Sequence, residues 1–250
     1  MRNTVMHEHG HGLGFSHTCP VAGIALMEPF LNTSFDGPRH DDLRAASNHY
    51  GDAFGPIGTT ALAFNIGTLA NSTTYTPTAI TVGGTIINGS LGSIDSSGEI
   101  DVFKVNVPGP QQVSITVAPL GSNYASYVQD SACNNTTPNV NSLSLVNLDF
   151  DILNAGGSIL LTRSAAAIGG TESFAGYILP AGDSYIRIKR NAADAFGGVQ
   201  LYNLTVSSFT PPVVSATDAL GLILHGRDAA HRDGEAGDGA ATARHARAAT

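Results

Sequence analysis

Seven short segments between residues 100 and 206 read as β-strands and are separated by Gly, Pro, Asn and Asp. The first, IDVFKVNV at 100–107, places Phe103, Val105 and Val107 on one face, with polar side chains opposite. The other six are 112–117, 146–152, 158–162, 174–179, 184–189 and 199–206. Strands at this spacing predict an antiparallel, jelly-roll-like β-sandwich over residues 79–208. A stretch of about 130 residues is long enough to bury its own core.

The composition excludes some classes of function. The 250 residues hold 12 Lys and Arg against 20 Asp and Glu, a net charge of -8, so a nucleic-acid partner is not expected. No stretch approaches the ~20 apolar residues of a membrane span. Abundant Gly, Ser, Thr, Asn and β-branched residues, with no tryptophan, are typical of a mainly β, secreted protein.

Helical character is confined to residues 1–55. MRNTVMHEHGHG at 1–12 predicts a helix ended by Gly12 and Gly14. RHDDLRAASNHYG at 39–51 predicts a second helix, with His40 or Asp41 near its N-cap.

Two further segments are expected to lie outside any packed domain. Residues 56–78 carry no charge and are rich in Thr, Asn, Gly and Pro, which predicts a linker. Residues 209–250 become Ala-, Gly-, Arg- and His-rich without apolar periodicity, which predicts a disordered tail. The abrupt change near 225 suggests a frameshifted end. The two cysteines, Cys19 and Cys133, define no disulfide framework, so unpaired thiols are favoured over a bond between them.

The segment HEHGHGLGFSH, residues 7–17, has the residue types and spacing of a catalytic metal site. His7 and His11, four residues apart, share one face of a helix and supply two imidazoles. Gly14 permits the left-handed turn that lets His17 reach back as a third ligand. A fourth position is left open for water, whose proton Glu8 would take. On a helix His9 points away from this pair, so it is expected to face solvent. The alternative is a histidine-rich tract with opportunistic metal affinity.

This string matches H-E-x-x-H-x-x-G-x-x-H, the zinc signature of the metzincin peptidases. ALMEP at 25–29 resembles the Met-turn of the matrixin branch, and residues 36–52 resemble its C-terminal helix. The resemblance covers residues 1–55, the back part of an α+β catalytic domain. It implies zinc bound by His7, His11 and His17.

The same resemblance implies further roles. Glu8 would be the general base and Met27 the Met-turn residue, and Pro29, Phe30 and Leu31 would form part of a specificity-pocket wall. Leu31 stands where the family usually has tyrosine. Cys19, close to the third ligand, is expected to be a bystander rather than a fourth ligand.

In metzincins a sheet with a substrate-binding edge strand precedes the zinc motif, so the resemblance implies an N-terminally truncated form. A signal peptide is then expected upstream and the protein is expected to be secreted. Little endopeptidase activity is expected from this chain alone.

The strand-rich part resembles the bacterial pre-peptidase C-terminal domain, a β-sandwich that follows secreted peptidases. Residues 91–110, 179–191 and 201–209 carry the likeness. Asp95, Glu99 and Asp101 surround one turn and could ligate calcium, although a solvated acidic turn is the simpler interpretation.

Together these features predict a secreted zinc metalloendopeptidase acting on protein or peptide substrates. The alternative is a non-catalytic, secreted β-sandwich module for binding or secretion, with a residual zinc site.

Overall fold

The computed structural model describes residues 1–77, 81–82, 85–86, 91–130, 132–133 and 138–209. Its two helices are α1 (Arg2–Gly12) and α2 (His40–Tyr50), and the short strand β1 (Thr18–Cys19) lies between them in sequence. Both helices match the expected ranges. The N-cap of α2 is Arg39, one residue before the expected position, because Oδ2 of Asp42 accepts a hydrogen bond from Arg39 N at 2.7 Å.

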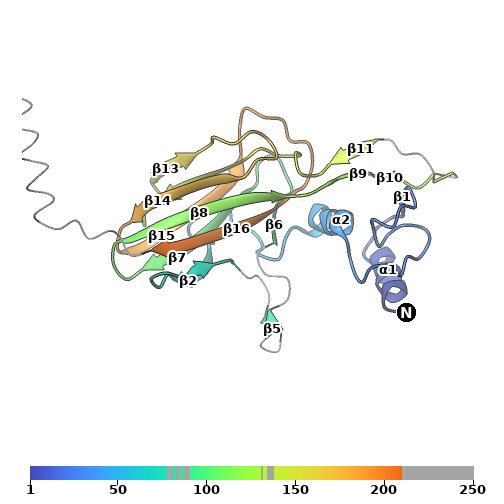
Figure 1. The fold of residues 1–250 in the computed structure, drawn as a ribbon, viewed down its shortest axis with the longest axis horizontal. Coiled ribbons are helices and arrows are strands. Elements are labelled where there is room, and N and C mark those ends of the chain that lie inside the picture. Colours follow the sequence, from blue (N-terminus) through green and yellow to red (C-terminus); the bar gives the residue numbers. More distant parts are fainter. Residues whose placement is uncertain (78–80, 83–84, 87–90, 131, 134–137, 210–250) are drawn as a thin grey trace, which may run out of the picture. The chain divides into compact units, whose positions relative to one another are not determined.

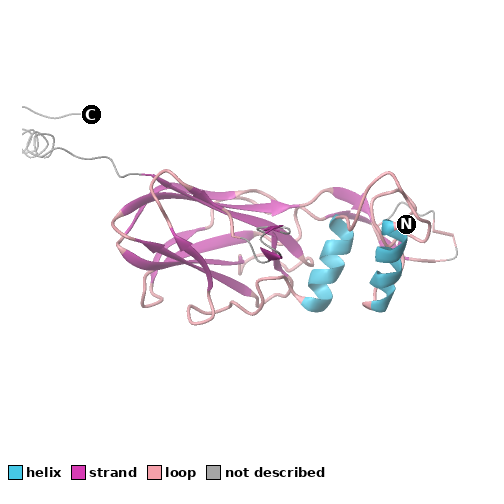
Figure 2. Ribbon diagram, turned by 90° about the horizontal axis from the view of Figure 1, so that it is seen from below, coloured by secondary structure: helices cyan, strands magenta, loops and turns pink. Residues whose placement is uncertain are grey.

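Two five-stranded sheets form the two layers of a β-sandwich (Figures 1 and 2). The first, ordered β13-β12-β15-β7-β2, contains β2 (Phe64–Thr68), β7 (Ile100–Val107), β12 (Leu148–Leu153), β13 (Ile159–Arg163) and β15 (Gly182–Arg190). The second, ordered β14-β8-β16-β3, contains β3 (Thr74–Tyr75), β8 (Gln111–Leu120), β14 (Glu172–Leu179) and β16 (Gln200–Phe209), with β6 (Leu91–Ile94) also paired to β16. The strands β4 (Thr81–Val82) and β5 (Thr85–Ile86) pair only with each other.

The prediction of a mainly β, sandwich fold is confirmed, and each of the seven expected strand segments is a strand. From β7 onward most connections cross from one sheet to the other, whereas β12 and β13 are adjacent strands of the first sheet. In β7 the alternation is reproduced, since Phe103, Val105 and Val107 are at most 1% exposed. These side chains pack with Ile115 and Leu204 from the second sheet in one core. The pairing of β2 with β7 is parallel, against the expected all-antiparallel arrangement.

The segment expected to be a linker, residues 56–78, carries β2, β3 and part of the core. Ile57 and Leu69 are buried, and the Phe64 ring lies 4.9 Å from the ring of Phe54. The Phe54 ring in turn lies 5.2 Å from that of Phe103. The segment therefore lacks charged residues because it packs against β7, and not because it is a solvent-exposed linker.

A second departure lies between β8 and β12, where the described residues 121–130, 132–133 and 138–145, here termed the excursion, lie outside the two sheets of the sandwich. The excursion contains β9 (Asn123–Ala125), β10 (Tyr127–Val128) and β11 (Asn139–Asn141). The strand β9 pairs with β11, and β10 pairs with β1 beside the first helix (Figure 1). Nothing in the sequence pattern predicts this pairing. Of the expected disordered tail, Phe209 is the last residue of β16, and residues 210–250 lie outside the described residues. Among the described residues, no helix is long and apolar enough to cross a membrane.

Candidate metal centre

Helix α1 and the turn after it bring three imidazoles together. His7 and His11 lie one turn apart on the helix, as their spacing predicts. Gly14 adopts φ +88°, the left-handed conformation expected of it. The amide of Phe15 donates to the carbonyl of Gly10 at 3.0 Å, and the chain then reverses toward His17. The turn at Gly14 thus brings the imidazole of His17 close to those of His7 and His11.

The ring nitrogens that meet are the three Nε2 atoms. Nε2 of His17 lies 3.1 Å from Nε2 of His7 and 3.0 Å from Nε2 of His11. Two imidazoles that bind one Zn²⁺ at 2.0–2.1 Å in tetrahedral directions place their nitrogens roughly 3.3 Å apart. The separations are therefore close to those of ligands to a common ion. The three histidines form the group of side chains that could hold a metal ion among the described residues.

The opposite nitrogen of each ring faces an oxygen atom. Nδ1 of His7 lies 2.7 Å from the carbonyl oxygen of Leu26, and Nδ1 of His11 lies 2.8 Å from that of Phe15. A carbonyl only accepts, so each Nδ1 carries the proton. The Nε2 lone pairs of His7 and His11 are then directed at the shared point, which is the arrangement that orients metal-binding histidines.

Met27 packs against the helix that carries His7 and His11. Its side chain is 4% exposed, and a Cβ atom at position 10 would collide with its Sδ. A glycine at position 10 therefore lets the methionine lie directly against the helix that carries His7 and His11. The carboxylate of Asp42, buried in α2, accepts hydrogen bonds from Leu26 N at 2.7 Å and Met27 N at 3.0 Å. Burial raises the pKa of Asp42, although these backbone N–H groups act to lower it.

A cleft of about 450 Å³ opens beside His17. One side is built from α2 and from Met27, and the other from Ser126, Tyr127 and Val128 of the excursion. Pro29, Phe30 and Leu31 are not part of this lining, and their role as a pocket wall stays a prediction. Phe30 and Leu31 are 69% and 49% exposed.

Glu8 and His9 both lie on the solvent side of α1. The exposure of His9 agrees with its expected position. The Glu8 carboxylate makes no hydrogen bond or ion pair with the described residues.

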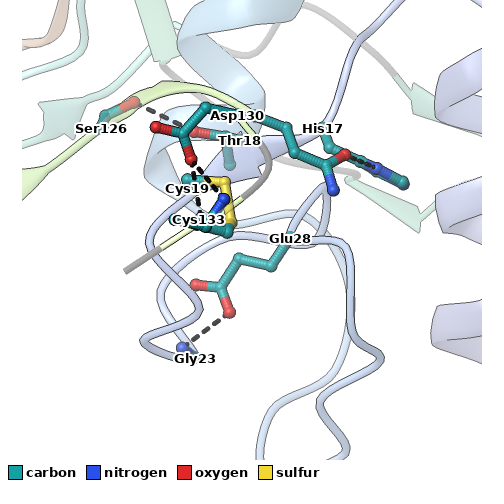
Figure 3. The surroundings of a disulfide bond; sticks show 10 residues. His17, Thr18, Cys19, Gly23, Glu28, Ser126, Asp130 and Cys133 are labelled. Carbon is teal, nitrogen blue, oxygen red and sulfur yellow. Dashed lines mark hydrogen bonds between the residues drawn. A yellow bond between two sulfur atoms is a disulfide. The ribbon is translucent and has the colours of Figure 1, made fainter. Parts of the chain in front are cut away.

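Cys19 and Cys133 form a disulfide, so the prediction of two unpaired thiols is wrong. The physical reason is the excursion, whose strand β10 pairs with β1 and brings the two Cα atoms to 5.2 Å. Cys19 is 1% exposed and its sulfur is bonded to Cys133, which excludes it as a fourth metal ligand in this structure. Figure 3 shows the disulfide with His17 and with Asp130, whose Oδ1 accepts Cys133 N at 2.7 Å.

The three carboxyls proposed for calcium line a second cleft, of about 340 Å³. The Glu99 carboxylate accepts the backbone N–H of Asp95. Asp101 is 1% exposed and accepts a hydrogen bond from the Tyr202 hydroxyl at 2.5 Å. Burial raises the pKa of Glu99 to about 7 and that of Asp101 to about 8.

Asp52, which the sequence analysis did not single out, adds a fourth carboxyl to this cluster. It accepts Ser93 N at 2.9 Å, and its charge contributes to the raised pKa of Asp101. No sequence signal links Asp52 to a turn more than forty residues away. Because these pKa values are raised, part of the cluster carries protons near neutral pH, and a calcium site here stays a prediction.

No protein-family model and no curated protein matches the sequence. Among the solved structures that resemble this chain, three examples all have low sequence identity and low TM-scores. The pre-peptidase C-terminal domain of a collagenase from Bacillus anthracis is 14% identical, covers 58% of this chain and 94% of its own, and has a TM-score of 0.34. A periplasmic inhibitor of g-type lysozyme from Aeromonas hydrophila is 15% identical, with 58% and 96% covered and a TM-score of 0.29.

The third is a carbohydrate-binding module in complex with calcium and xylotriose, 12% identical, with 54% and 98% covered and a TM-score of 0.29. At these TM-scores the similarities carry no argument about the function of this chain.

Proposed function

We propose that the chain carries a zinc centre that hydrolyses peptide bonds, in the manner of a metalloendopeptidase. The observation that carries the proposal is the convergence of three Nε2 atoms at 3.0–3.1 Å contacts. Each opposite Nδ1 faces an oxygen within 2.6–2.8 Å, which fixes the rings in the orientation that a metal needs. In a histidine-rich tract with only opportunistic metal affinity, we would not expect all three rings to be held by such hydrogen bonds.

The chemistry follows from the donor set. Three neutral imidazoles favour Zn²⁺, and a zinc ion there would polarise a peptide carbonyl and lower the pKa of a bound water. Glu8 follows His7 in sequence, and its carboxylate would take the proton of the attacking water. An extended peptide would place a side chain in the cleft beside His17, between α2 and the excursion. His7, His11, His17 and Glu8 are thus the residues on which the proposal rests.

A second candidate is a non-catalytic β-sandwich module with a residual zinc site. The observation that favours it is Glu8, which is exposed and whose carboxylate makes no hydrogen bond or ion pair with the described residues to hold it toward the triad. In that case the sandwich carries the binding function, and the metal serves to order residues 1–55.

The disulfide supports placing the protein in an oxidising compartment, as expected of a secreted protein.

The test compares wild type, Glu8→Gln and His9→Gln in the full chain. Zinc content is measured after dialysis, and cleavage of a casein-type substrate is followed. We expect one zinc per chain in all three. Because little activity is expected of this chain alone, cleavage should be weak in wild type and in His9→Gln, whose changed residue lies outside the triad, and absent in Glu8→Gln. Zinc binding with no cleavage by the wild-type protein would favour the binding module. Absence of zinc from the wild-type protein would contradict both.

A further inference from the structure

The ring of His17 is oriented by a side chain of the excursion and not by a residue of its own segment, 1–55. Nδ1 of His17 lies 2.6 Å from Oε1 of Gln129, a residue 112 positions away. For His7 and His11 the equivalent acceptors are backbone carbonyls of residues 1–55. Gln129 is therefore the one side chain, among the described residues, that serves as an acceptor for a ring of the triad.

His17 has more need of such a partner than the other two. His7 and His11 are fixed by the helix that carries them, whereas His17 follows the Gly14 turn and lies outside any helix. Its ring is partly exposed, so packing alone does not set its rotation. An acceptor at Nδ1 keeps the proton on that nitrogen and leaves Nε2 free for the metal. An amide turned the other way would donate to Nδ1 and put the proton on Nε2, which blocks ligation.

Gln129 is itself held in place by several contacts. Its backbone N–H donates to the carbonyl of His17 at 3.2 Å, which extends the pairing of β10 with β1. The Cys19–Cys133 disulfide ties the same two segments covalently. The excursion is also bound to α2, because Asp41 accepts hydrogen bonds from the hydroxyls of Tyr124 at 2.8 Å and Ser126 at 3.1 Å.

We propose that Gln129 is a positioning residue of the metal centre. The excursion thereby contributes a side chain that orients one of the metal ligands. The inference rests on the proposed function, since it concerns the same zinc ion. Gln129 fixes the tautomer and rotation of His17 through the Nδ1–H···Oε1 hydrogen bond. The excursion, which also lines the cleft, thereby couples the sandwich to the chemistry of residues 1–55.

The test is the zinc affinity of the full-length chain, measured by competition with a chromogenic chelator. Gln129→Ala should bind zinc 10- to 100-fold more weakly, the range found when an outer partner of a metal-binding histidine is removed. Gln129→Glu should bind at least as tightly as wild type, because a carboxylate also accepts from Nδ1. Gln112→Ala is the matched control, since Gln112 lies at the start of β8, the end remote from the excursion, and its affinity should not change.

Two spectroscopic readouts separate positioning from a general loss of structure. In the zinc-free protein, nitrogen NMR of the His17 ring should show the Nδ1–H tautomer in wild type and Gln129→Glu, and a mixture in Gln129→Ala. The visible spectrum of the cobalt-substituted protein should be altered only in Gln129→Ala. Wild-type zinc affinity and an unchanged tautomer in Gln129→Ala would overturn this proposal alone. A wild-type chain that binds no zinc would overturn the proposed function, and this proposal with it.

Discussion

Asp42 and Met27 are linked through the backbone, with Oδ1 of Asp42 accepting the N–H of Met27 at 3.0 Å. The same carboxylate accepts the N–H groups of Leu26 and Arg39, each at 2.7 Å. We expect Asp42→Ala to lower the free energy of unfolding by roughly 3 kcal/mol or more, because buried N–H groups lose their acceptor. Urea unfolding provides the measurement. Asp36→Ala is the control, since Asp36 pairs with Arg2 at the surface and should cost less than about 1 kcal/mol.

Substitutions within the histidine cluster should separate ligands from bystanders. We expect His17→Ala to abolish high-affinity zinc binding, because one of three converging Nε2 atoms is lost. His9→Ala should bind zinc as wild type does, since His9 lies on the same segment but is exposed and outside the triad. Titration calorimetry measures both affinities. Equal weakening by the two substitutions would indicate an unstructured histidine tract.

Removing the disulfide should weaken both the fold and the metal centre. The bond closes a loop with a sequence separation of 114, so the double change Cys19→Ser and Cys133→Ser should cost about 2–4 kcal/mol of unfolding free energy. Zinc affinity should fall as well, because the bond helps to hold the strand that precedes Gln129. Thermal unfolding with and without reductant gives the comparison. The double variant serves as its own control, since added reductant should no longer change its Tm.

The buried acidic cluster should make stability depend on pH. The pKa of Asp101 is raised to about 8, against about 3.9 in an unfolded chain. Between these values the folded state holds a proton that the unfolded state has lost, so stability falls as pH rises and levels off above about 8. Asp101→Asn should remove about 1.4 kcal/mol per pH unit of this slope. The measurement is urea unfolding in EDTA between pH 5 and pH 8.

Calcium offers a separate check on the same residues. A calcium site at Asp95, Glu99 and Asp101 predicts a higher Tm at pH 8 when calcium is added, and no such rise in Asp101→Asn. Asp183→Asn is a control, because Asp183 pairs with Lys104 on the outer face of the first sheet and should keep the wild-type response. Identical Tm values with and without calcium in the wild-type protein would leave the cluster as a proton-binding site only.

The start of the sandwich can be tested with fragments. A fragment of residues 79–208 lacks Phe54, Ile57 and Leu69, each of which is buried in the sandwich core. We expect it to unfold cooperatively but at a lower urea concentration than a fragment of residues 52–208. Circular dichroism at increasing urea gives both midpoints. Equal midpoints would show that residues 56–78 are dispensable for the sandwich, as a linker would be.

Features set by neighbouring residues were predicted well from the sequence. The strand segments follow from side-chain alternation, and the approach of His7, His11 and His17 follows from helical spacing and one glycine turn. The features that were not predicted depend on contacts between residues distant in sequence. No residue near Cys19 indicates that β10 pairs with β1. Likewise, no residue near Asp52 indicates that its carboxylate lies beside the turn that contains Asp95. These contacts exist only once the excursion and the sheets are in place.

The prediction that residues 56–78 form a linker was wrong for a different reason. Its lack of charge is common to flexible linkers and to buried strands, and composition alone does not separate the two. The deciding partner is β7, which takes β2 in parallel pairing. Gln129 was missed because a glutamine has no signature as an outer partner of a metal-binding histidine until its ring neighbour is known.

The Cys19–Cys133 bond also determines what a protease could achieve on this chain. Any single cut between those two residues leaves the pieces joined through sulfur, since the bond spans the cut. A single cut within 56–78 therefore cannot free residues 1–55 while the cystine is intact. Such nicked material would run as one band on a gel without reductant and as two with it. After a single cut of this kind, separation of the two pieces would require reduction of the bond by a thiol.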